Sequence, residues 1–249
     1  MNRPLVILLL SFFLMWLATR IGVYFHNRRP ELSEGERDDY NLVLTSTLTL
    51  LGLIIGFTFS MAVSRYDQRK NYEEAEANAI GTEYVRAELL PATDVAHVKE
   101  LLRAYLDQRI LYYRTVRERD LSPINAKTAQ LEDELWASVR GPAVATPNAT
   151  GAIVVMGMND VLNSQGYTQA AWWNRIPTAA WLLMFAIAFC ANAMIGFGSR
   201  TRHRGLFLVL PLVVSVSFFL ISDIDSPRGG TIRVRPQNLE SLAQSLNPH

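Results

Sequence analysis

The sequence has little of what most enzymes and nucleic-acid-binding proteins contain. Its 249 residues include one cysteine, which excludes a disulfide scaffold and a cysteine-based metal site. Lys and Arg number 24 against 23 Asp and Glu, whereas a nucleic-acid-binding domain is basic. The histidines are scattered, and no HExxH, glycine-rich phosphate loop or GxSxG occurs. The sequence therefore predicts no enzyme, no cofactor, no metal site and no nucleic-acid partner.

Charged residues are also absent from four long stretches. These are Pro4–Thr19, Tyr40–Ser64, Ile176–Ser199 and Gly205–Ser222. A helix needs ~20 apolar residues to cross a ~30 Å hydrocarbon core. The second and third stretches exceed that length, and soluble helices normally carry a polar face. The pattern predicts an all-α membrane protein with four transmembrane helices.

The first stretch reaches membrane length if its helix continues to Phe25, with Arg20 extending to the interface. A cleaved signal peptide is the alternative. The residues after the apolar core, Arg20 to Val23, do not form a small-x-small cleavage site, which favours a retained helix.

The predicted organisation has four parts. Residues 1–64 hold the first two transmembrane helices, 65–175 a helical domain, 176–222 the other two crossings, and 223–249 a C-terminal tail. No helix breaker separates Ser64 from Pro91, so the second helix, from about Asn41, is expected to continue into water. Residues 141–151 have the composition of a loop. Four crossings put both termini and the helical domain on one side, but basic residues divide evenly and do not predict which side.

One side of the second helix carries a graded stripe, spaced by three and four residues. It consists of Thr49, Leu53, Phe57, Ser60 and Ser64, and steps of seven extend it to Asn71 and Asn78. Around a symmetry axis, this stripe would give an apolar neck that opens into a polar vestibule, and apolar necks gate ions by dewetting. The alternative is that Gly52, Gly56 and the two serines are small residues for tight helix packing.

Two carboxylates farther along this helix, Glu76 and Glu83, are seven residues apart and share a face. They are candidates to line an ion pathway, or to bind a metal if paired across subunits. The alternative is a solvated helix face whose charge is balanced by Lys70 and Arg86.

Several segments resemble bacterial bestrophins. Gly56-Phe57, Arg65-Tyr66, Arg69-Lys70 and Asn78-Ala79 follow the order and spacing seen in that family after its pore neck. Asp223-Ile-Asp225-Ser-Pro227 resembles its acidic segment after the last crossing. Nearly the whole chain, including TFSMAVSRYDQRK, EEAEANAIGTEYVRAELLP and DIDSPRGGTIRV, is similar to bacterial membrane proteins described as a bestrophin-like domain of unknown function.

This resemblance implies a homopentameric, passive channel for inorganic ions in the lipid bilayer of a bacterial inner membrane, with cytoplasmic termini. It assigns the neck to Thr49, Leu53 and Phe57. Thr49 is more polar than the apolar necks of the family, and Pro-Phe-Gly becomes Pro227-Arg-Gly. The acidic calcium-binding run of animal bestrophins is reduced to Asp223 and Asp225, so calcium gating is not expected.

The alternative function is a non-conducting membrane scaffold or sensor whose helical domain docks a partner. A transporter is less favoured, because the sequence lacks the inverted repeat that many transporters show.

Overall fold

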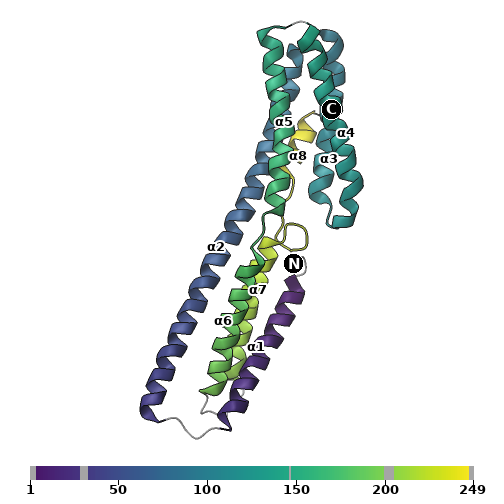
Figure 1. The fold of residues 1–249 in the computed structure, drawn as a ribbon. Helices are drawn as coiled ribbons and strands as arrows, with labels where there is room; N and C mark the ends of the chain where they lie inside the picture. The colour runs from purple at the N-terminus through teal and green to yellow at the C-terminus, as the bar shows by residue number, and fades with distance from the viewer. Residues whose placement is uncertain (1–3, 29–32, 146, 199–204, 247–249) are drawn as a thin grey trace. The chain divides into compact units, whose positions relative to one another are not determined.

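The computed structural model describes residues 4–28, 33–145, 147–198 and 205–246, and all regular structure within these ranges is helical (Figure 1). Four helical stretches are long and apolar enough to cross a membrane, by length and composition. The chain divides into two compact units. Residues 1–64 and 175–232 form the first, here called the membrane unit, and residues 65–174 and 233–249 form the second, here called the helical unit.

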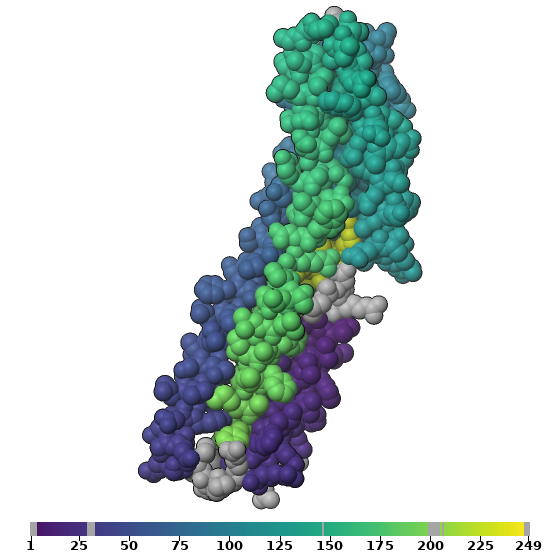
Figure 2. Space-filling view, in the orientation of Figure 1, coloured from purple at the N-terminus to yellow at the C-terminus, as the bar shows by residue number. Residues whose placement is uncertain are grey.

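In the membrane unit, α1 (Pro4–His26) packs against α6 (Thr178–Phe197) and α7 (Leu206–Asp225). Figure 2 shows α1 and α6 side by side on the face turned to the viewer. Two glycines allow this close approach, because a Cβ on Gly22 would collide with the Ala193 carbonyl and one on Gly196 with the Thr19 carbonyl. Pro211 lies inside α7, which continues through it.

Helix α2 (Glu34–Arg86) is one uninterrupted helix of 53 residues (Figure 1), which confirms the expected extension beyond Ser64. Its expected start near Asn41 was wrong by about two turns. Ser33 and Glu36 form a capping box: the Ser33 backbone N–H donates to the Glu36 carboxylate at 2.8 Å, and the Glu36 N–H donates to Ser33 Oγ at 3.4 Å. This cap lets the charged sequence before Tyr40 enter the helix.

The helical unit combines the second half of α2 with η1 (Ala87–Leu89), α3 (Ala92–Arg114), η2 (Glu118–Asp120), α4 (Leu121–Ala145), α5 (Ala149–Trp173) and α8 (Gln237–Leu246). Its core contains Leu102, Tyr105, Leu135 and Met158, all at most 1% exposed. Pro91 directly precedes α3, in agreement with its expected role as a helix breaker.

The loop expected over residues 141–151 is largely helical. Helix α4 includes Pro142 and continues to Ala145, and α5 begins at Ala149. The Asn148 side chain accepts the Gly151 N–H at 2.7 Å and so caps α5. The C-terminal helix α8 was not expected at all.

Candidate functional site

The stripe on α2 lies on an exposed side of the helix. Phe57 is 66% exposed and Leu53 is 53% exposed, and Thr49, Ser60, Ser64, Asn71 and Asn78 are exposed too. The opposite side of the same helix is buried at Leu51, Thr58 and Ala62. An exposed side of α2, here called the bare side, is therefore apolar at Leu53 and Phe57 and polar farther along, and none of the described residues of the chain buries it.

The membrane-spanning part of α2 is the least covered of the four candidate crossings. In its apolar window 11% of the residues are buried, against 44% in α7. Gly52 and Gly56 lie on the bare side, and a Cβ built on either would have no described neighbour within 4 Å. Among the described residues of one chain, these two glycines therefore do not serve the tight helix packing considered for them.

The hydroxyls on the stripe differ in their hydrogen bonds. Thr49 donates to the Thr45 carbonyl at 2.9 Å, which satisfies its polar group inside the helix. The side-chain hydroxyls of Ser60 and Ser64 have no hydrogen-bond partner among the described residues. Hydroxyls that are left open on an exposed side are suited to contact water or a neighbouring subunit.

The acidic residues of α2 lie on the other side of the helix. Glu76 and Glu83 are each 0% exposed, so the solvated face considered for them is wrong. They do not lie beside the stripe but between α2 and the helices packed on it. Glu73, which is not one of the two predicted ion-pathway carboxylates, is also buried, at 1% exposure.

Glu76 is the centre of a buried polar network between α2, α3 and α5. Its carboxylate accepts hydrogen bonds from the Arg109 guanidinium, from Tyr113 Oη at 3.2 Å and from Thr168 Oγ1 at 3.1 Å. Burial and the adjacent Glu76 charge raise the pKa of Tyr113, which keeps its phenol a donor. The network holds α2, α3 and α5 together, because separating these helices would leave buried charges without their partners.

Glu73 holds the C-terminal helix. Its carboxylate accepts the backbone N–H groups of Asn238 and Leu239, each at 3.0 Å, and the Asn238 side-chain amide at 2.6 Å. These donors belong to the first turn of α8, whose N–H groups have no partners within the helix. Burial raises the pKa of Glu73, although these hydrogen bonds oppose the rise.

Glu83 lies against Gly157 of α5. Neither of its carboxyl oxygens has a hydrogen-bond partner among the described residues. A Cβ on Gly157 would collide with Glu83 Oε2 and would also stand 2.5 Å from Arg86 Nη1. Burial raises the pKa of Glu83 to about 8, with Arg86 opposing the rise and Asp160 adding to it.

The motif after the last crossing closes the end of α7. Asp223 accepts the Thr231 N–H at 2.8 Å, the Thr231 hydroxyl at 2.7 Å and the Ile232 N–H at 2.9 Å. Asp225 accepts the Ile176 N–H at 3.2 Å. Pro227 is buried in the turn between them and Thr231. Both carboxylates therefore have backbone donors, and no cluster of three or more metal-ligating residues occurs within the described ranges.

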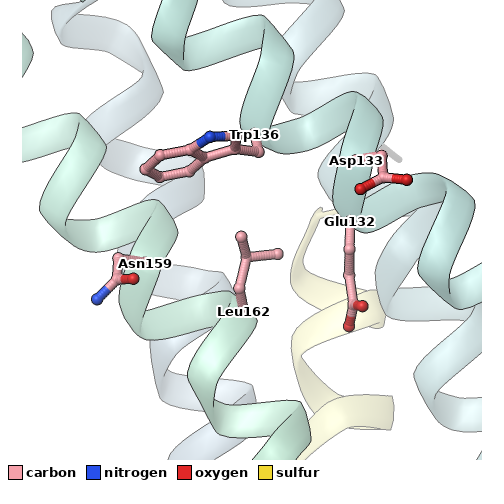
Figure 3. Close-up of a pocket in the computed structure, with 5 residues that line it drawn as sticks. All are labelled: Glu132, Asp133, Trp136, Asn159 and Leu162. Atoms are coloured by element: carbon pink, nitrogen blue, oxygen red, sulfur yellow. The ribbon is translucent and has the colours of Figure 1, made fainter.

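A groove of about 380 Å³ lies between α4 and α5 of the helical unit (Figure 3). It is lined by Glu132, Asp133, Trp136, Asn159 and Leu162. Figure 3 shows the Trp136 ring from α4 and the Leu162 side chain from α5 on either side of the same space. Burial raises the pKa of Glu132, whose carboxylate also accepts the Tyr105 hydroxyl at 3.4 Å. An aromatic ring beside carboxylates favours cationic groups.

Together, the four membrane-length helical stretches, one of which belongs to the long α2, define a multi-pass membrane protein. The chain belongs to the Bestrophin-like domain family, whose model it matches over residues 8–239.

Solved structures show the same fold. A variant of a bacterial bestrophin homologue from Klebsiella pneumoniae has a TM-score of 0.67 at 15% identity, covering 96% of this chain and 97% of the other. A second structure of the Klebsiella pneumoniae homologue has a TM-score of 0.64 at 15% identity, covering 97% and 95%. A structure described as a membrane protein has a TM-score of 0.65 at 14% identity, covering 98% and 97%. Among curated proteins, no sequence matches the chain.

Proposed function

We propose that the chain forms an oligomeric, passive ion channel of the bacterial inner membrane, with α2 around the central axis. The observation that carries the proposal is the exposed stripe on α2. It changes from apolar at Leu53 and Phe57 to hydroxyl-bearing at Ser60 and Ser64, and to amide-bearing at Asn71 and Asn78. Membership of the Bestrophin-like family supports the same function.

In this proposal the neck consists of Thr49, Leu53 and Phe57, and the inner vestibule of the serines and asparagines. A pentamer with cytoplasmic termini is the arrangement that the resemblance implies. The pathway follows the stripe and not Glu76 or Glu83, because these carboxylates are on the buried side of α2. Apolar rings of this kind control ion passage by excluding water.

The test compares two phenylalanines on the same helix. Both side chains are exposed, but only Phe57 is on the stripe. Phe59 lies two residues farther along the chain and therefore about 200° around the helix. We expect purified protein in liposomes to conduct ions, Phe57→Ala to raise the flux severalfold, and Phe59→Ala to leave it near the wild-type level. Sealed liposomes at high protein density, or equal effects of the two variants, would count against the channel.

A second function, a non-conducting scaffold or sensor, is favoured by one observation, the groove between α4 and α5. The exposed part of Trp136 could receive a cationic side chain of a soluble partner. This function predicts a copurifying partner that is lost on Trp136→Ala, together with liposomes that remain sealed.

A further inference from the structure

The contact between α2 and α5 contains a carboxyl group that the channel proposal does not use. Glu83 is 0% exposed, and both of its oxygens lack a hydrogen-bond partner within the described part of the chain. By contrast, Glu73 and Glu76, on the same side of the same helix, each accept three or more hydrogen bonds. A buried carboxylate without donors is unfavourable in its ionised form.

The surroundings of Glu83 leave little room for water while the two helices are in contact. Gly157 provides the surface on which the carboxyl lies, and even a methyl group at this position would collide with it. The charged groups whose fields reach the carboxyl are Arg86 from α2 and Asp160 from α5. Arg86 lies against the same glycine but makes no ion pair with Glu83 within the described residues.

We propose that Glu83 is a proton-dependent switch in the packing of α2 against α5. When protonated, it is neutral and stays against Gly157. When it loses its proton, the carboxylate must be hydrated. Because Glu83 has no exposed surface and its carboxyl lies directly against Gly157, the water enters by separation of α5 from α2 near this glycine.

The direction of the pH effect follows from proton linkage. Burial keeps the proton on folded Glu83 up to a pKa of about 8, whereas an unfolded chain releases it near ~4.3. The unfolded state therefore binds fewer protons between these values, and stability falls as pH rises through this window. A neutral glutamine at position 83 removes this dependence.

The protonation of Glu83 and the separation of α5 from α2 do not require ion conduction. If the proposed channel is correct, this separation would also affect α2 where it lines the pore, and that consequence rests on the proposed function. The experiments below use full-length protein in detergent and need no flux, so failure of the switch and failure of the channel can be distinguished.

The first experiment is infrared difference spectroscopy between pH 6 and pH 9. We expect a protonated-carboxyl band in the wild type that disappears with a midpoint near pH 8, and no such band in Glu83→Gln. Asp160→Asn removes the negative charge that repels the Glu83 carboxylate, so it should shift the midpoint to lower pH. Because Asp160 is exposed, this variant should fold normally. Glu74→Gln, at an exposed position of α2, is the matched control and should behave as the wild type.

The second experiment is amide hydrogen exchange in residues 152–162 of α5, corrected for the intrinsic pH dependence of exchange. We expect protection in this segment to fall above pH 8 in the wild type and in Glu74→Gln, but to stay constant in Glu83→Gln. A wild type without a titrating carboxyl band above pH 6, the same band in Glu83→Gln, or unchanged protection while the carboxyl titrates would each overturn the proposal.

Discussion

At the scale of single residues, the buried side of α2 in the helical unit carries three carboxylates with three different environments. Glu73 accepts the N-terminal N–H groups of α8, and Glu76 pairs with Arg109. Glu83 has no donor among the residues that the structure describes. The first two join helices together, and the third makes the contact between its helices depend on a proton.

A first prediction concerns the Glu76 network. Glu76→Ala should destabilise the protein by about 3–5 kcal/mol, because it leaves the buried Arg109 charge uncompensated. Glu74→Ala, at an exposed position two residues away, should change stability by less than ~0.5 kcal/mol. Thermal unfolding in detergent measures both, and equal losses in the two variants would contradict a structural role for Glu76.

These residues also show what sequence reasoning could and could not predict. Spacing by three and four predicted that Thr49, Leu53 and Phe57 share a side of the helix, and the structure finds that side exposed. A spacing of seven placed Glu76 and Glu83 on one face but gave no indication of their burial. Periodicity identifies which residues share a side, whereas the burial of that side depends on helices distant in sequence.

At the scale of elements, α1 and α6 are held close by glycines. Gly22 and Gly196 each take the place of a side chain that would collide with the opposite backbone, at Ala193 and Thr19. In a membrane the hydrophobic effect does not drive helices together, so close backbone packing of this kind carries much of the association.

The corresponding prediction compares two glycine substitutions. Gly22→Ala should destabilise the membrane unit by about 1–3 kcal/mol, because the added methyl overpacks the contact with α6. Gly166→Ala, in α5 with no described atom within 4 Å of its Cβ, should instead stabilise by about 0.5–1 kcal/mol through helix propensity. Opposite shifts in melting temperature are expected, and a neutral Gly22→Ala would refute the close packing.

The positions of helix ends are a second feature that sequence reasoning predicted poorly. Hydropathy predicted the four membrane-length helices, and the absence of helix-breaking residues predicted the long α2. The start of α2 was missed although Ser33 and Glu36 have capping-box spacing, a local signal that could have revealed it. The helical course through Pro142 was missed for a different reason, since composition suggests a loop wherever Gly, Pro and Asn cluster.

At the scale of the whole molecule, the bare side of α2 is the feature that one chain leaves incomplete. The other crossings bury 33% to 44% of their apolar windows, and α2 buries 11%. Lipid can cover Leu53 and Phe57, but the polar residues of the same side need water or another subunit. This mixture supports the oligomer proposed above.

The prediction at this scale uses disulfide crosslinking. In a Cys190→Ala background, Phe57→Cys should form disulfide-linked dimers on oxidation in the membrane, because a narrow ring brings neighbouring subunits within bonding distance. Phe59→Cys is the matched control and should stay monomeric on denaturing gels. Dimers at both positions, or at neither, would contradict an α2 ring around a central axis.

The unbroken course of α2 also has a consequence for how this sequence can evolve. Each residue inserted into a helix turns everything beyond it by about 100°. A single insertion between Phe57 and Glu76 would therefore change the angle between the bare side and the carboxylates that anchor α3, α5 and α8. Related genes should accordingly tolerate substitutions across residues 40–86 but hold this segment at constant length, with insertions and deletions confined to the connections between helices.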